Sequence, residues 1–379
     1  MKAIIIGAGI GGLTAAIALK NKGIEVEVYE QASEFKRLGA GISLWTNALR
    51  AFKEIGLEQK IINLGAEINS SKLLTYNGQE LSAIPAAQFK EKFGFPSVVI
   101  HRGDLQEILV DALGAESIFL NKTFQAYHDN DGITVDFLDG TSARGDLLIA
   151  ADGIHSKVRR QCFGDIPPKY AGATVFRGIC KQDIPEVELG SCFETWGQNG
   201  RFGVFPMRNN EIYWYFTFKQ PANNILKEEK RKSFVETNVS NWHQPIASII
   251  RKTDMPDILQ NDMFEIPALK TWYKNNLVLL GDAAHAMQPN LGQGAVMAIE
   301  DAIILADALA KHDDITTALE DYQSRRLARA NKVQRLSKHL GPIGQINNPI
   351  LSSLRNTIFK LIPNSFRMRE FNWLFNFEI

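Results

Sequence analysis

A glycine-rich turn near the start of the chain restricts the fold more than any other feature. Residues 7–12 read Gly-Ala-Gly-Ile-Gly-Gly and follow an apolar run at residues 2–6, which predicts a buried parallel strand. Residues 13–22 predict a helix that stops at Gly23, and residues 24–30 alternate as a second strand. This order predicts a βαβ unit of a Rossmann-like α/β fold.

The same turn has the chemistry of a dinucleotide site. One glycine permits the tight turn, one lets the backbone approach a pyrophosphate, and one lets the helix pack on the strand. Glu30, 18 residues after Gly12, is placed to bind ribose hydroxyls and disfavours a 2′-phosphate, so FAD and NAD both fit. A glycine turn of another α/β protein is the alternative. The predicted cofactor contacts are Gly7, Gly9, Ile10, Gly11, Gly12 and Glu30.

A second segment repeats the arrangement of a strand followed by a polar turn. Residues 120–150 predict a β-meander, and the run 147–150 leads to Asp152 and Gly153. Doubly wound folds bind ligands at the carboxyl ends of such strands. His155, Lys157 and Arg159 make the loop cationic, which suits phosphates, although a simple strand exit is the alternative.

A third segment begins with the buried strand 277–280, which ends at Gly281 and Asp282. A loop, Pro-Asn-Leu-Gly-Gln-Gly over residues 289–294, then opens a helix expected near 293–309. A helix N-terminus aimed at the pyrimidine edge of a flavin would stabilise negative charge on the reduced ring. The order of the three segments favours one shared flavin dinucleotide.

With these three motifs, the chain resembles the single-component, class A flavoprotein monooxygenases of the p-hydroxybenzoate hydroxylase type over about residues 1–340. The resemblance implies FAD as cofactor and NAD(P)H as a transient co-substrate. It also implies hydroxylation or epoxidation of a small planar, aromatic substrate with O2, through a flavin C4a-hydroperoxide. A reductase or dehydrogenase without oxygen insertion is one alternative, and a non-catalytic FAD-binding module is another.

The resemblance also assigns cofactor residues by position. Asp282 would bind the ribityl chain, and Arg102 would contact FAD from the start of a helix. Asp152 would take part in binding FAD and in the use of NAD(P)H. The segment 39–44 would run beside the flavin, and residues around 289–294 would border the isoalloxazine ring. An ordinary surface role for Arg102 is the alternative, and His285 is expected to be a buried histidine. The further cofactor residues are Arg37, Gly41, Ser43, Leu291, Gly292 and Gly294.

An insert over 170–268 predicts an antiparallel sheet above the flavin, with strands at 174–180, 192–196, 201–207 and 211–219. Arg201 and Tyr213 are expected on one face, where guanidinium and phenol groups suit a planar anionic substrate. The resemblance is nearest to urate and aromatic-acid hydroxylases and makes Arg201, Tyr213 and Pro289 the active-site residues. Urate hydroxylases have an aspartate where this chain has Asn290, which argues against urate. A solvent-facing Arg201 is the alternative.

The predicted architecture is therefore a Rossmann-like FAD-binding domain with an inserted antiparallel-sheet substrate domain and C-terminal helices. The FAD-binding domain comprises 1–75, 98–169 and 269–340, the substrate domain 76–97 and 170–268, and the helical segment 341–379. The aromatic-rich end of that segment suits a terminal helix docked on the core, with a membrane-surface or dimer helix as the alternative.

The composition excludes several classes of function. Lysine plus arginine and aspartate plus glutamate are 42 each, which gives no general attraction to nucleic acid. Three cysteines without a CxxC pair favour a reducing cytoplasm and predict no metal site. The apolar runs are too short for a membrane span, and a homodimer is one option for assembly.

Overall fold

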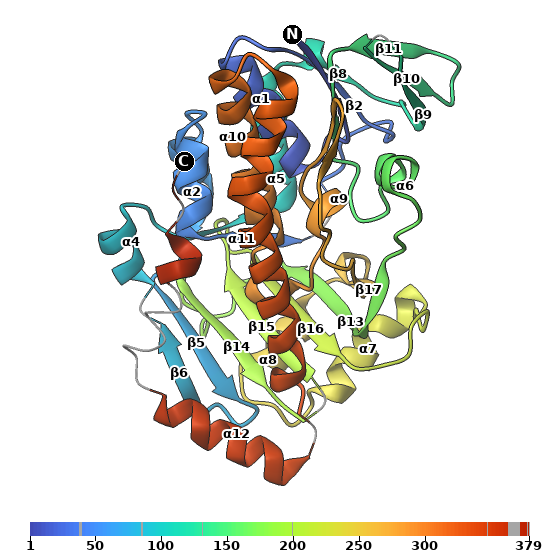
Figure 1. Ribbon diagram of the computed structural model, residues 1–379. Coiled ribbons are helices and arrows are strands. Elements are labelled where there is room, and N and C mark those ends of the chain that lie inside the picture. The colour runs from blue at the N-terminus through green and yellow to red at the C-terminus, as the bar shows by residue number, and fades with distance from the viewer. Residues whose placement is uncertain are drawn as a thin grey trace.

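The computed structural model describes residues 1–37, 40–84, 86–130, 132–198, 200–346, 348–362, 372–376 and 378. Gly39 of the predicted flavin loop and most of the segment after residue 362 lie outside this range. The chain forms two main sheets with helices packed around them (Figure 1).

The first main sheet has six strands, drawn from both halves of the chain, in the order β18-β19-β12-β1-β2-β8. Its neighbours pair in parallel except for β18, as expected for a doubly wound sheet. The predicted βαβ unit and the strands before both later motifs are confirmed. The strands are β1 (Lys2–Ile6), β2 (Glu25–Tyr29), β8 (Ile118–Phe119), β12 (Leu147–Ala150), β18 (Tyr273–Lys274) and β19 (Leu277–Leu279).

Long helices cover this sheet, and α1 packs against both α5 and α10 while α10 packs against α11 (Figure 1). The predicted meander is present as an antiparallel sheet in the order β11-β10-β9. The helices are α1 (Ile10–Asn21), α5 (Arg102–Leu113), α10 (Gly294–Lys311) and α11 (Ile315–Gly344), and the meander strands are β9 (Phe124–Asp129), β10 (Ile133–Phe137) and β11 (Ser142–Gly145).

The second main sheet has seven strands in the order β17-β13-β16-β15-β14-β5-β6. Asn209 and Asn210 turn β15 into β16 with φ of 60° and 57°, as in a hairpin turn that needs two left-handed residues. The strands are β5 (Ser70–Thr75), β6 (Glu80–Ile84), β13 (Lys169–Cys180), β14 (Ser191–Trp196), β15 (Gly200–Pro206), β16 (Ile212–Phe218) and β17 (Leu259–Glu265). β5 pairs with β14 in this sheet, whereas the sequence placed 70–75 in the FAD-binding part; the domain division stays a prediction.

The alternation along β16 separates two faces of this sheet. Trp214 and Phe216 join a buried cluster with α7 (Glu228–Asn238) and α8 (Ile246–Lys252). Tyr213 lies on the opposite face and packs on Gly41, in the loop region predicted to border the flavin. The second face of the seven-stranded sheet therefore points toward Gly41 and the predicted flavin site.

Smaller elements connect the two sheets. A three-stranded sheet in the order β3-β7-β4 is formed by strands that alternate along the chain with those of the two main sheets. Among the described residues, none of the helices combines the length and the hydropathy that a membrane span requires. Within the same residues, no group of His, Cys, Asp and Glu has the arrangement of a metal site. The elements are β3 (Gly41–Leu44), β4 (Ala66–Glu67), β7 (Val98–His101), α2 (Thr46–Lys53), α3 (Glu58–Leu64), α4 (Ala87–Phe93), α6 (Lys157–Phe163), α9 (Asp282–His285) and α12 (Pro349–Leu361), with the 3₁₀ turns η1 (Ala115–Ser117), η2 (Met255–Asp257) and η3 (Pro289–Leu291).

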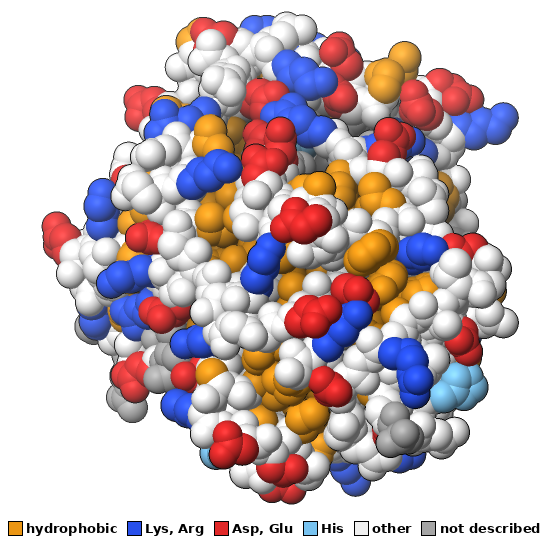
Figure 2. Space-filling view, turned by 90° about the horizontal axis from the view of Figure 1, so that it is seen from above, with side chains coloured by type: hydrophobic (Ala, Val, Ile, Leu, Met, Phe, Trp, Pro, Cys, Tyr) orange, Lys and Arg blue, Asp and Glu red, His pale blue; other side chains and the backbone are white. Residues whose placement is uncertain are grey.

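Acidic and basic side chains are intermixed on the face seen in Figure 2, with apolar side chains between them. This mixture agrees with the equal numbers of acidic and basic residues in the sequence.

An ionic cluster lies buried between α10 and α11. Arg326 contacts Glu300 at 2.6 Å and Asp301 at 2.7 Å, and all three side chains are at most 1% exposed. Asp301 also contacts His285 Nε2 at 2.6 Å and accepts the Gly281 amide at 3.2 Å. His285 is therefore buried, as expected, although its partner is a carboxylate. The cluster fixes the turn that carries Asp282.

Candidate active site and cofactor cleft

The three glycine-containing segments lie directly against one another. A Cβ atom on Gly7 would lie 2.4 Å from the carbonyl oxygen of Ala151, beside Asp152. A Cβ atom on Gly11 would lie 2.9 Å from Leu280, just before Gly281. The approach at Gly7 requires glycine, because the added atom would overlap backbone, whereas a Cβ atom at Gly11 would make the Leu280 side chain shift. The first motif therefore touches the second and the third.

Gly9 differs from the other glycines of the turn. A Cβ atom there would meet nothing within 4 Å, whereas one on Gly12 would lie 2.0 Å from the Gly7 carbonyl oxygen. Gly12 is thus required by helix packing. The space at Gly9, at the N-terminus of α1, is where a phosphate would approach free backbone N–H groups.

Glu30 holds the glycine turn in place. Its two carboxylate oxygens accept the backbone amides of Ala8 and Ala32, each at 2.9 Å. A carboxylate has about four acceptor positions, so further hydrogen bonds from ribose hydroxyls remain compatible with these two. The predicted ribose contact stays a prediction, and the structure adds a positioning role.

The central motif is tied to its surroundings through Asp152 and Arg159. One Asp152 oxygen accepts the amides of Lys157 and Val158 at 2.8 and 3.2 Å. The other oxygen is buried and has no hydrogen-bond partner among the described residues. Arg159 is 2% exposed and donates to the carbonyl of Ala283 at 2.8 Å. It joins the second motif to the third, and its guanidinium also donates to the Ile154 and Ile166 carbonyls.

Asp282 and Arg102 face a deep cleft. Both side chains are exposed, and yet desolvation by surrounding protein raises the pKa of Asp282 and lowers that of Arg102. A side chain can be accessible to solvent and still be surrounded by protein when it lines a cleft rather than the outer surface. Each group also acts on the other, because Arg102 favours the charged form of Asp282 and Asp282 that of Arg102. The first and last parts of the predicted cofactor site thus meet here.

The remaining predicted cofactor residues border the same region. Gly41 packs on the Tyr213 ring, where a Cβ atom would lie 2.6 Å from the ring, and Ser43 follows on β3. Arg37 binds Asp104 through two hydrogen bonds of 2.6 and 3.1 Å. The charge of Arg37 is therefore already paired with Asp104, which lies in α5 two residues after Arg102. The predicted direct contact of Arg37 with FAD stays a prediction.

The loop after Asp282 brings polar groups without protein partners to the start of α10. Pro289 and Leu291 form η3, Gly292 has φ of 62°, and Gly294 begins the helix. Trp45 Nε1 lies 3.1 Å from where a Cβ atom of Gly292 would be. This nitrogen and Gln293 Nε2 are both buried and have no hydrogen-bond partner in the part of the chain that the structure describes. These donors suit a ligand with several carbonyl and ring-nitrogen acceptors.

The residues fit FAD. The open space at Gly9 accommodates a pyrophosphate, the cleft between Arg102 and Asp282 accommodates a linking chain, and donors near Gly292 suit a polar ring edge. Three separate observations therefore agree with a single extended dinucleotide.

Aromatic side chains form the part of the seven-stranded sheet that faces this cleft. The ring centroids of Phe205, Tyr213 and Tyr215 lie 5.9 to 6.4 Å apart. Gly203 leaves room for the Tyr215 ring, because a Cβ atom there would lie 2.3 Å from it. Burial raises the pKa of both tyrosines, so their phenols stay protonated. This surface is suited to stacking a planar ring.

Arg201 shares this face, but it does not adjoin Tyr213. The strand register places it opposite Thr217, and Tyr213 opposite Phe205, with Tyr215 between them. Arg201 is 3% exposed, donates to the Asn290 side-chain oxygen, and has Glu194 3.7 Å away. The alternative of a solvent-facing Arg201 is therefore wrong. Asn290 connects it to the loop that begins at Pro289.

Glu194 and Arg177 were missed by sequence reasoning. Glu194 accepts hydrogen bonds from Tyr215 and Trp196 and is the counterion of Arg201. Arg177 disfavours the charged form of Arg102, so its guanidinium lies near the cofactor cleft. The period of two along β13 and β14 would have placed both on the face of Tyr215, but their partners come from other strands.

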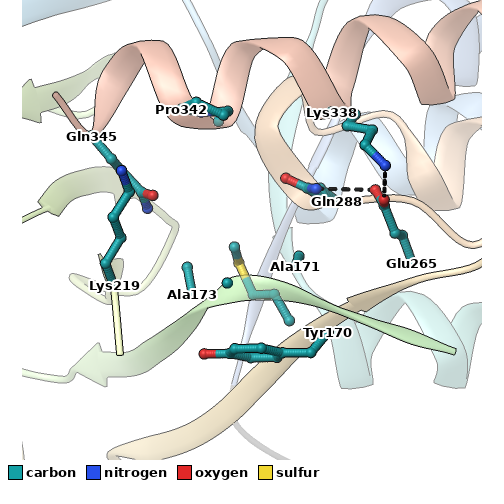
Figure 3. A pocket seen from close by; sticks show the side chains of 12 residues that line it. Tyr170, Ala171, Ala173, Lys219, Glu265, Gln288, Lys338, Pro342 and Gln345 are labelled. Carbon is teal, nitrogen blue, oxygen red and sulfur yellow. Dashed lines mark hydrogen bonds and ion pairs between the residues drawn. The ribbon is translucent and has the colours of Figure 1, made fainter. Parts of the chain in front are cut away.

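A cavity of about 270 Å³ lies between β13, β17 and the end of α11 (Figure 3). Gln288 and Gln345, which line it, contact Asn290 and Thr217 respectively. Lys338 and Gln288 both point at Glu265 across the cavity, while Tyr170 lies on the opposite wall (Figure 3).

Known proteins resemble the chain over nearly its whole length. Residues 1–337 match the family model described as FAD binding domain. The chain is 36% identical over 363 residues to aurachin C monooxygenase/isomerase of Stigmatella aurantiaca, which covers 95% of this chain and 94% of that protein. It is 32% identical to an FAD-dependent urate hydroxylase of Klebsiella pneumoniae, covering 87% of this chain and 86% of that protein.

A solved structure agrees with these relatives. The Klebsiella pneumoniae protein HpxO complexed with FAD and uric acid superposes with a TM-score of 0.92 at 28% identity, covering 98% of this chain and 95% of that chain. The sequence relatives and the solved structure therefore both identify FAD-dependent enzymes as the proteins similar to this chain.

Proposed function

Since this chain belongs to the FAD binding domain family and is an FAD-dependent monooxygenase, we propose that it oxygenates a planar aromatic or heteroaromatic ring held between the cofactor cleft and the face of β15 and β16. The observation that carries this proposal is the triangle formed by Phe205, Tyr213 and Tyr215 beside Gly41. When bound and reduced by NAD(P)H, FAD supplies the activation of O2 and the transfer of one oxygen atom to the substrate.

The protein residues divide the remaining tasks. Arg102 and Asp282 hold the cofactor along the cleft, and the N-terminus of α10 faces its ring through Gly292 and Gly294. The tyrosines stack the substrate and exclude water, which protects a reactive oxygen species from wasteful breakdown. Pro289 and Leu291 shape the floor beside the ring.

Arg201 orients a neutral oxygen substituent in this proposal. Glu194 already offsets its charge at 3.7 Å, and Asn290 accepts one of its N–H groups. A full carboxylate would therefore meet a pair that is close to neutral, whereas a carbonyl or phenol oxygen needs only a hydrogen-bond donor. This differs from the planar anion expected from sequence. Asn290 uses both its N–H groups on Gln288 and Ser337, so it acts as a positioning residue.

The test measures NAD(P)H oxidation stimulated by planar ligands, with mass spectrometry of the product. We expect absorption bands near roughly 370 and 450 nm from bound FAD and a product heavier by one oxygen atom. Arg201→Gln should keep the flavin spectrum and lose stimulation, whereas Glu194→Gln should shift preference toward carboxylate ligands. Arg144→Gln, at an exposed position of β11, is the control. Full stimulation in Arg201→Gln would refute the assignment.

We also propose a cytoplasmic location, which the three free and buried cysteines support. The homodimer suggested by sequence is open to measurement by light scattering.

A further inference from the structure

The C-terminal helix α12 is amphipathic in the opposite sense to an ordinary surface helix. Its outward side chains are apolar, with Ile350 78%, Leu354 57% and Leu361 75% exposed. Leu351 and Ile358 on the same side are 53% and 50% exposed. A surface helix of a globular protein normally turns its polar face to water. An exposed group of large aliphatic side chains marks an interaction surface.

The inner side of α12 is held firmly on the protein. Arg355 is 6% exposed, donates to the carbonyl of Ile343 at 3.0 Å, and lies 4.8 Å from the centroid of the Trp196 ring. Phe359 meets the same ring edge-on at 4.9 Å. Asn348 caps the helix by accepting the amides of Ile350 and Leu351. The helix is therefore anchored through Arg355 and Phe359, which leaves its aliphatic side chains outward.

The charge of this part of the chain favours an anionic partner. From Tyr322 to Arg369 the sequence contains ten lysines and arginines and no aspartate or glutamate. Arg325, Arg326, Arg329 and Lys338 of this set are paired with carboxylates of the protein, so the proposed attraction depends on the others and mainly on α12 itself. Within α12, Lys360 is exposed beside the apolar face and no carboxylate is present. Aliphatic side chains flanked by lysine, on a helix without acidic residues, are the features of a helix that lies in the surface of an anionic bilayer.

The position of α12 agrees with such contact. Figure 1 shows the helix lying across the end of the molecule that is opposite the six-stranded sheet, next to β6. From the combination of exposure, anchoring and charge, we propose that α12 docks the enzyme on the surface of a bilayer that contains anionic phospholipid. Trp196, under the helix, bonds to Glu194, so the docked side is also the side of Arg201.

Vesicle co-sedimentation of the full-length, FAD-loaded enzyme tests the proposal independently of catalysis. We expect binding to vesicles of phosphatidylcholine mixed with phosphatidylglycerol, and weaker binding to phosphatidylcholine alone. The double variant Leu354→Ser, Ile358→Ser should bind roughly ten-fold or more weakly, because aliphatic groups drive interfacial binding. Lys360→Glu should weaken binding only to the anionic vesicles.

The matched control is Leu138→Ser, Leu189→Ser, which removes two aliphatic side chains that are 63% and 60% exposed elsewhere. It should bind like the wild type. Absence of binding, or equal losses in both double variants, would overturn the proposal. Light scattering without lipid gives a further check: a dimer that dissociates in the α12 double variant would assign the face to a second copy of the chain instead.

Discussion

Replacing Arg326 with methionine tests how strongly the buried ionic cluster supports the fold. Arg326 neutralises Glu300 and Asp301, which are both 0% exposed. In the variant, Glu300 still has Arg329 at 2.7 Å. Among the described residues, Asp301 would be left with His285 and the Gly281 amide. Removing one member of a buried ion pair costs about 3–5 kcal/mol. We expect the free energy of unfolding of the apoprotein to fall by about this amount at neutral pH.

The pH dependence follows from the direction of the shifts. Burial alone would raise the pKa of Asp301, but His285 and Arg326 hold it below the usual value. A lowered carboxyl pKa contributes stability that is present above the unfolded-state pKa, near about 4, and is lost as the pH falls through the folded-state value. Removing Arg326 takes away one of the two charges that lower the pKa of Asp301, so the folded-state pKa of this carboxyl should rise. The stability that the lowered pKa contributes in the wild type is lost as the pH falls through about 4, so the deficit of the variant relative to wild type should narrow at acid pH.

Urea unfolding of both apoproteins at several pH values measures this deficit. Arg325→Met is the matched control on the same helix, because its partners Asp307 and Asp321 are 18% and 28% exposed. A partly exposed pair contributes about 0–1 kcal/mol, so the control should lose little. A deficit for Arg326→Met that stays below about 1 kcal/mol, or that does not change with pH, would refute the reasoning.

Two further predictions concern cofactor binding. Gly9→Ala should leave the unfolding temperature of the apoprotein unchanged and weaken FAD binding, because the added methyl meets only the open space. Gly12→Ala should lower both the unfolding temperature and the FAD affinity, since its methyl would overlap the Gly7 carbonyl. Equal behaviour of the two variants would contradict the assignment of Gly9. Asp282→Asn should weaken FAD binding roughly 10- to 100-fold in a fluorescence titration, which is the effect of losing a charged hydrogen bond. Its apoprotein should not be destabilised, because burial disfavours the charge of Asp282. Unchanged affinity would remove Asp282 from the cofactor site.

The sequence predicted elements whose signals are local. The run 2–6 became β1, and the predicted strands at 201–207 and 211–219 are present as β15 and β16. Asn209 and Asn210 make the turn between them, because asparagine tolerates the left-handed conformation that they adopt. Patterns of this kind act over a few residues and so can be read without the tertiary structure.

The partners of charged residues could not be predicted in the same way. Arg159 donates to a carbonyl 124 residues away, and Arg201 is paired with Glu194 and Asn290 from two other segments. These contacts depend on how strands and loops meet after folding, which no local period encodes. The expectation of an anion at Arg201 came from assuming that its charge was free. The structure instead provides a counterion.

This distinction bears on how the cofactor is recognised. Glu30 and Arg159 use their charges on backbone groups that hold the loops together, and Asp152 caps α6. Arg102 and Asp282 remain directed at the cleft, and because they have opposite charges, each partly offsets the field of the other. FAD affinity must therefore come mainly from backbone N–H groups at the helix N-termini and from contact with its large ring. Charge screening acts weakly on such contacts, so flavin binding should depend little on ionic strength.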